Sequence, residues 1–150
     1  MKLNPDYRDM LSGFSEAKAE YLLIRAYALA SHGLVRATKN IDLWVRPTPE
    51  NAARVVKALI SFGAPVDHFS AEDFTRPNNV LQVGVAPVRI DLTTSVSGLT
   101  FEKAWKSREV IEVDDLSVPV IGLAGLITNK RSSGRPQDLV DLEWLENVDD

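Results

Sequence analysis

Two short segments decide the fold: Asn40-Ile41-Asp42-Leu43 and Arg89-Ile90-Asp91-Leu92. In each segment polar and apolar residues alternate, which is typical of a β-strand with one face in the core. On the first strand Asn40 and Asp42 share one face, and the aliphatic residues take the other. Asp91 has the same place in the second strand. If the two strands are neighbours, the Asp42 and Asp91 carboxylates converge on one spot of the sheet.

Two carboxylates that converge on a strand surface have two interpretations. They form a site for a divalent cation, because carboxylate oxygens are the hard ligands that such ions prefer. Alternatively, each aspartate lies at a strand end, where water solvates its charge. The matching Ile-Asp-Leu frames favour neither interpretation clearly, so the residues alone leave both open.

The flanking sequence predicts further strands and helices in a single domain that spans residues 1–150. Short β-rich runs indicate strands, and apolar residues at helical spacing with Pro or Gly at the ends indicate helices. The expected strands are 21–24, 41–45, 80–85, 87–94, 109–113 and 116–120, and the expected helices are 5–19, 26–32, 49–63, 101–107, 123–131 and 136–145. Residues 67–79 lack sustained periodicity, so we expect a loop with one helical turn at most. This order predicts an α+β fold with a mixed β-sheet flanked by helices.

The composition is that of an ordinary globular domain, with 45% hydrophobic and 25% charged residues. The chain has no cysteine, which excludes disulfide scaffolds, thiolate metal sites and cysteine nucleophiles. A formal net charge of −4 argues against a dedicated binder of double-stranded DNA, because such proteins carry basic surfaces. No apolar run approaches the ~20 residues that span a bilayer, and the first residues lack the apolar stretch of a signal peptide. We therefore expect a cytoplasmic protein without membrane contacts.

Residues 21–33 and 36–45 together carry a family resemblance, which Arg89-Ile90-Asp91, Ser97-Gly98 and residues 129–142 extend over nearly the whole chain. This combined pattern resembles the nucleotidyltransferase superfamily. It is most similar to the small bacterial proteins grouped with minimal nucleotidyltransferases and with the abortive-infection (AbiEii-like) toxins of toxin–antitoxin systems. The resemblance implies the nucleotidyltransferase fold.

The resemblance also implies a reaction, the Mg²⁺-dependent transfer of a nucleoside monophosphate from a nucleoside triphosphate to an acceptor. In that family three carboxylates hold two Mg²⁺ ions, and a Gly-Gly or Gly-Ser pair lets the backbone approach the triphosphate at a helix start. By position, Asp42 and Asp91 correspond to the second and third carboxylates, as metal ligands and catalytic residues. Lys130 lies on a helix whose counterpart reaches the phosphates, although a solvated lysine is the alternative for this residue.

This chain departs from the family pattern at the catalytic motif itself. Asn40 stands where the first carboxylate is expected, so the metal site of Asn40, Asp42 and Asp91 has one negative charge fewer. Arg25-Ala26 replaces the glycine pair at the position that binds the nucleotide. Arg25 either supplies a cation to the phosphates or fills the space that they need. These departures predict that nucleotidyl transfer is impaired or lost.

Two classes of function remain open at this stage. The first is a transferase that modifies a protein, an RNA end or a small molecule. The second is a pseudoenzyme, a regulatory module that kept the fold and binds a nucleotide, a partner protein or a second copy of itself as a homodimer. A nucleotidyltransferase of antibiotic resistance is a weaker third hypothesis, since no segment has the acidic surplus that would mark a site for a polycationic drug.

Overall fold

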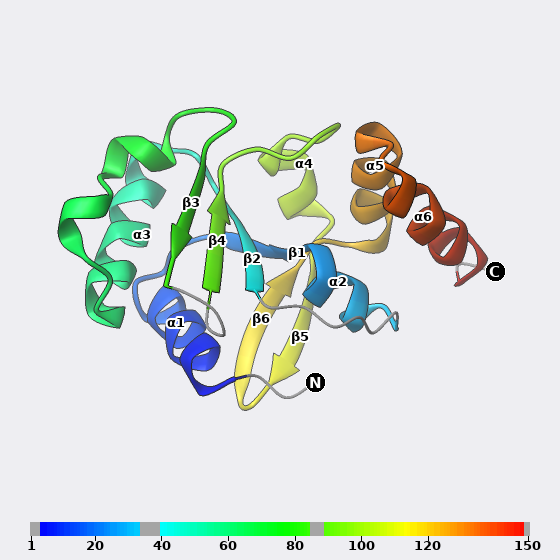
Figure 1. Cartoon of the computed structure of the whole chain (residues 1–150). Helices are drawn as coiled ribbons and strands as arrows, with labels where there is room; N and C mark the ends of the chain where they lie inside the picture. Colours follow the sequence, from blue (N-terminus) through cyan, green and yellow to red (C-terminus); the bar gives the residue numbers. More distant parts are fainter. Residues whose placement is uncertain (1–3, 34–39, 85–88, 149–150) are drawn as a thin grey trace.

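The computed structural model describes residues 4–33, 40–84 and 89–148 and shows one sheet with helices packed around it (Figure 1). The strands are β1 (Tyr21–Ile24), β2 (Asn40–Val45), β3 (Val80–Val83), β4 (Arg89–Thr93), β5 (Glu109–Val113) and β6 (Leu116–Val120). The helices are α1 (Pro5–Glu16), α2 (Arg25–Ser31), α3 (Pro49–Phe62), α4 (Phe101–Lys106), α5 (Leu123–Ser133) and α6 (Pro136–Val148), with short 3₁₀ helices η1 (Val66–His68) and η2 (Ala71–Phe74). None of these helices is long and apolar enough to cross a membrane.

The six strands are arranged in the order β3-β4-β2-β1-β6-β5. Strand β2 lies in the interior of the sheet, antiparallel to β1 and parallel to β4. Strands β3 and β4 pair antiparallel, and so do β5 and β6, as the sequence predicts for two hairpins. Strands β1 and β6 run parallel, so both kinds of pairing occur in one sheet. The prediction of an α+β fold with a mixed sheet is confirmed.

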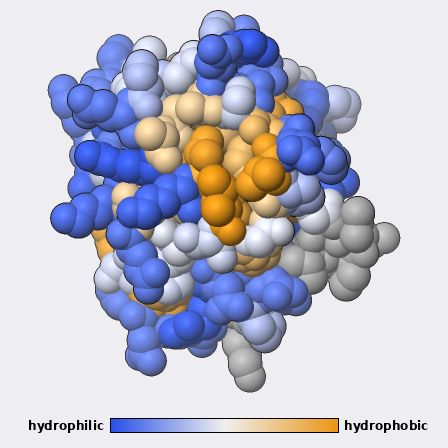
Figure 2. Space-filling view, turned by 90° about the vertical axis from the view of Figure 1, so that its left-hand side faces the viewer, coloured by the Kyte–Doolittle hydropathy of each residue, from blue (hydrophilic) through white to orange (hydrophobic). Residues whose placement is uncertain are grey.

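Helices α1 and α3 pack against each other and lie side by side in Figure 1. The apolar stripe of α1 is buried, and α3 begins at Thr48, whose hydroxyl accepts a hydrogen bond from the Asn51 backbone amide. Helix α3 ends at Gly63, where φ is +96°, a conformation that glycine adopts without steric cost. The side of the molecule on which α3 lies carries a compact hydrophobic patch among hydrophilic residues (Figure 2). Exposed apolar residues in this region of the chain include Ile60 of α3 and Val80 of β3.

The structure differs from the sequence expectations mainly at the ends of elements. Helix α1 stops at Glu16, three residues early, and α5 and α6 run on to Ser133 and Val148. The expected loop at 67–79 instead contains parts of two 3₁₀ helices, and η2 begins with a capping box between Ser70 and Asp73. Each of these 3₁₀ helices makes only about one turn, so the sequence of this segment is too short to show helical periodicity. The turn between the expected strands 80–85 and 87–94 lies outside the described residues.

The junction of β1 and α2 forces an unusual backbone conformation on Arg25. Ile24 is fully extended, and Arg25 is the first residue of the helix with a φ of +60°. Left-handed backbone costs an L-residue about 1–2 kcal/mol, because its Cβ crowds the following carbonyl oxygen. Glycine has no Cβ and avoids this penalty. The junction therefore has the backbone geometry that suits the glycine expected from the family resemblance, although an arginine occupies it.

Replacing Arg25 by glycine or by alanine separates this backbone effect from the loss of the side chain. Both variants remove the guanidinium, but only Arg25→Ala keeps the strained Cβ. We expect Arg25→Gly to be more stable than Arg25→Ala by about 1 kcal/mol in urea unfolding. Equal stabilities, or a more stable alanine variant, would contradict the assigned backbone conformation.

Candidate functional site

Asp42 and Asp91 lie directly opposite each other at the centre of the sheet. They are register partners on the parallel strands β2 and β4, as are Asn40 and Arg89 two residues earlier. Because side chains on a strand alternate in direction, all four share one face of the sheet. Asp42 is only 7% exposed and both aspartates lie within their strands, so the alternative of solvated strand ends is wrong.

The Asn40 side chain connects the two carboxylates. Its amide nitrogen donates to Asp42 Oδ2 at 3.0 Å and to Asp91 Oδ2 at 3.2 Å. The two carboxylates therefore both lie within hydrogen-bonding distance of one nitrogen atom, which is close enough for them to share a bound cation. The convergence predicted from the alternating pattern is observed.

Two arginines neutralise the carboxylate pair from opposite sides. Arg25 Nε lies 3.6 Å from Asp42 Oδ1, and Arg89 Nε lies 3.3 Å from Asp91 Oδ1. Arg89 also donates from Nη2 to Asp91 Oδ2 at 3.4 Å. Neither ion pair through Nε forms a hydrogen bond, and Asp91 Oδ1 is a buried oxygen without a hydrogen-bond donor among the described residues. The arginines therefore compensate the charge while leaving a coordinating oxygen unsatisfied.

Burial makes the Asp42 carboxylate difficult to ionise. The pKa of Asp42 is raised to about 6, mainly because burial removes the carboxylate from water; the charge of Arg25 lowers this pKa and that of Asp91 raises it. At neutral pH the site thus holds a charge that a bound cation would stabilise.

These residues fit one Mg²⁺ ion better than two. Asp42 and Asp91 offer carboxylate oxygens, including the unsatisfied Asp91 Oδ1, and the Asn40 amide could turn about its last bond to offer its own oxygen. Mg²⁺ is typically bound by one or two carboxylates together with water and substrate phosphates. However, the described residues contain no cluster of three or more histidine, cysteine, aspartate or glutamate side chains suited to a metal. A second dication would lack the anionic ligands it needs.

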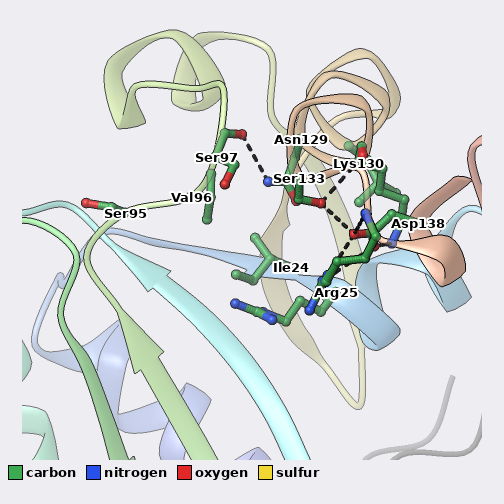
Figure 3. A pocket seen from close by; sticks show the side chains of 11 residues that line it. Ile24, Arg25, Ser95, Val96, Ser97, Asn129, Lys130, Ser133 and Asp138 are labelled. Atoms are coloured by element: carbon green, nitrogen blue, oxygen red, sulfur yellow. Dashed lines mark hydrogen bonds and ion pairs between the residues drawn. The ribbon is translucent and has the colours of Figure 1, made fainter.

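Two cavities of about 300 Å³ are both lined by Arg25, the partner of Asp42, and share the cationic side chains of Lys130 and Arg135 as well. We call them the α5 cavity and the α6 cavity. The α5 cavity is lined by Ile24, Arg25, Ser95, Val96, Ser97, Leu126, Asn129, Lys130, Ser133, Arg135 and Asp138 (Figure 3). The α6 cavity is lined by Arg25, Ala26, Leu29, Lys130, Arg135, Pro136, Gln137, Asp138 and Asp141. Since Ile24 is the register partner of Asp42, the α5 cavity adjoins the carboxylates through β1.

Lys130 is buried at the contact between α5 and α6, so the alternative of a solvated lysine is wrong. Its Nζ lies 3.1 Å from Asp141 Oδ2 and 3.5 Å from Asp138 Oδ1. Burial tends to raise the pKa of Asp138, but hydrogen bonds from Arg135 and Ser133 outweigh it and hold that pKa well below its usual range. Lys130 therefore pairs with two buried aspartates, of which Asp138 is held ionised, while it lines both cavities.

The structure brings the sequence-predicted residues together around Arg25. Asn40, Asp42 and Asp91 form the carboxylate cluster, Arg25 contacts it, and Ala26 and Lys130 lie on the cavity side. Sequence analysis missed Arg89, Arg135 and Asp138 as members of the site. Arg89 was detectable, because the alternation that places Asp91 also places a residue two positions away on the same face. Lys130 and Arg135 share Asp138 as a partner, and this arrangement depends on how two helices meet, which no local pattern encodes.

Comparison with known proteins supports the fold but gives no closer assignment. The sequence matches no protein-family model and no curated protein sequence. The structure is similar to that of the lincosamide antibiotic adenylyltransferase LnuA with lincomycin bound, at 13% identity over 98% of each chain and a TM-score of 0.62. It is also similar to a putative nucleotidyltransferase from Thermotoga maritima, at 16% identity over 97% of this chain and 96% of that one, again with a TM-score of 0.62. At such identities the similarity shows the fold alone: the chain has the nucleotidyltransferase fold.

The raised pKa of Asp42 makes a pH-dependent prediction for the substitution Asp42→Asn. The folded pKa of about 6 exceeds that of the unfolded chain, so the ionised carboxylate destabilises the fold above pH 6. This penalty disappears as the pH falls through the unfolded value near 4. Without divalent cations, we expect Asp42→Asn to be about 1–3 kcal/mol more stable than the parent at pH 7.5, and to lose most of that advantage near pH 4.

Urea unfolding at both pH values measures this difference. The exposed Asp9 provides a control, since Asp9→Asn removes the same charge without a burial penalty. An advantage of Asp42→Asn that is the same at both pH values would contradict the role given to its ionisation.

Proposed function

We propose that this protein binds a nucleoside triphosphate together with one Mg²⁺ ion, and that its nucleotidyl transfer is impaired or lost. The observation that carries the proposal is the position of Arg25. This residue contacts the carboxylate cluster through Asp42 and also lines the two cavities that contain Lys130 and Arg135. A ligand with adjacent phosphates and a coordinated cation fits this arrangement, since its phosphates face the cationic cavities and its cation faces the anionic cluster.

Each group has a distinct role in this proposal. Asp42 and Asp91 hold the ion, with the Asn40 amide oxygen as a weaker neutral ligand. Arg25, Lys130 and Arg135 face the phosphates from the cavity side, where guanidinium and ammonium groups bind phosphate oxygens well. Asp42 and Asp91 would hold a Mg²⁺ ion, whose positive charge would offset the negative charge of the phosphates.

The loss of transfer follows from the donor set. A transfer that depends on two metal ions requires ligands for both, and Asn40 contributes no charge where the resembling family has a carboxylate. In this structure the Asn40 amide instead donates to Asp42 and Asp91. The two carboxylates are thus partly satisfied without a metal, which weakens their affinity for one.

A non-catalytic regulatory module is the second candidate, and the charge balance of the site favours it. Arg25 and Arg89 match Asp42 and Asp91 in number, so the cluster is neutral without any ion. If some transfer remains, the acceptor is a protein, an RNA end or a small molecule. A place among abortive-infection toxins of bacterial toxin–antitoxin pairs is part of this proposal, and the identity of the neighbouring gene tests it directly.

Isothermal titration calorimetry with the four nucleoside triphosphates tests nucleotide binding. We expect binding that is at least about tenfold tighter with Mg²⁺ than with a chelator, because the phosphates supply ligands that the protein lacks. Asp91→Asn should abolish this metal dependence. No binding of any nucleotide at millimolar concentration would refute the proposal.

Restoring the family motif tests the explanation for the impairment. The triple variant Asn40→Asp, Arg25→Gly, Ala26→Gly acts on both the metal and the phosphate positions. We expect it to bind Mg²⁺ and nucleotide at least about tenfold tighter than the parent, whereas Asn40→Asp alone should gain less because Arg25 still pairs with Asp42. A triple variant that folds normally and gains nothing would show that these three residues are not the cause.

A further inference from the structure

Arg25 pairs with Asp42 and also lines a cavity, and one guanidinium cannot fully contact both Asp42 and a ligand in that cavity. On one side its Nε lies 3.6 Å from Asp42 Oδ1. On the other it lines the α5 cavity, opposite Ser95 and Ser97 and below Lys130 and Asp138 in Figure 3. Its side chain is 48% exposed, so rotation about its bonds does not require the core to open.

The other cations of the site are held more tightly. Lys130 has Asp138 and Asp141 as partners in a buried contact, with the shorter distance 3.1 Å. Arg135 donates from Nε to Asp138 Oδ2 at 2.8 Å. The Arg25 pair is longer than both and includes no hydrogen bond among those that the structure shows. Arg25 is thus the cation that an incoming anion moves at the lowest cost.

We propose that Arg25 is a coupling residue: an anion of adjacent phosphates in the α5 cavity draws the guanidinium away from Asp42 and so frees that carboxylate for a cation. This inference rests on the proposed function and adds to it a link between the phosphate-binding cavity and the carboxylate cluster. Without the anion, Arg25 competes with a divalent cation for Asp42. With the anion, the same charge binds the ligand instead.

The coupling has a thermodynamic consequence that holds without any metal. Linkage is reciprocal, so if the anion weakens the Arg25–Asp42 pair, then loss of Asp42 must strengthen anion binding. Loss of Asp91 removes the same charge from the same cluster but leaves the partner of Arg25 in place. Asp91→Asn is therefore a matched control for the general effect of charge.

The test uses inorganic tripolyphosphate in the presence of a chelator, with calorimetry as the readout. We expect Asp42→Asn to bind it at least about fivefold tighter than the parent, a typical size for coupling between sites, and Asp91→Asn to gain less than about twofold. The gain should vanish when Asp42→Asn is combined with Arg25→Gly. Arg25→Gln provides a second background if the glycine variant does not fold, which circular dichroism checks.

A second readout is the affinity for Mg²⁺ alone. We expect Arg25→Gly to bind Mg²⁺ more tightly than the parent, because the competing cation is gone. If the Asp42→Asn gain persists without Arg25, or if Asp91→Asn gains as much, then only general electrostatics acts and the coupling is refuted while nucleotide binding stands. If tripolyphosphate binds to no variant, the coupling is refuted, whereas the proposed function is decided separately by the titration of nucleoside triphosphates with Mg²⁺.

Discussion

Two negative charges lie opposite each other inside a sheet, on neighbouring parallel strands, and the rest of the site is arranged around them. Asp42 and Asp91 are register partners, and register in a sheet with buried faces cannot slip without moving every apolar side chain to the wrong face. The chain therefore cannot separate the carboxylates; it can only compensate them. Asn40 does so with an amide, and Arg25 and Arg89 with charge.

The same constraint appears again between the last two helices. The inward face of α6 carries Asp138 and Asp141 as well as Leu145, all buried, whereas Leu139 and Val140 point outward. An ordinary amphipathic helix would have the opposite arrangement. Lys130 makes this arrangement stable, because breaking a buried ion pair on one side leaves an uncompensated charge that typically costs several kcal/mol. Lys130 therefore contributes to the position of α6, and with it to the cavity wall, because it pairs with both buried aspartates.

The sequence predicted those parts of the molecule that repeat locally. Alternation in β2 and β4 was enough to place Asn40, Asp42 and Asp91 on one face, and the short spacing between β-rich runs was enough to predict both hairpins. It failed where structure depends on contacts between distant segments, as for buried Lys130. It also failed where one residue departs from its preferred backbone conformation. The residues around Arg25 do not by themselves indicate its φ of +60°; only the glycine that the resemblance leads one to expect at this position does.

Arg25 and Asn40, which stand where the resembling family would have a glycine and a carboxylate, have a joint electrostatic effect. A site with three carboxylates and no arginine at position 25 would be strongly negative and would require bound cations to be stable. Replacing one carboxylate by Asn40 and adding Arg25 shifts the local charge toward the positive twice, and the observed cluster is neutral with two arginines and two aspartates. Either residue alone would leave the cluster charged. With Arg25 and a carboxylate at position 40, three carboxylates would face two arginines; with Asn40 and no arginine at position 25, two carboxylates would face one arginine. Arg25 and Asn40 thus act together on one charge balance, in which two aspartates face two arginines at the centre of the sheet.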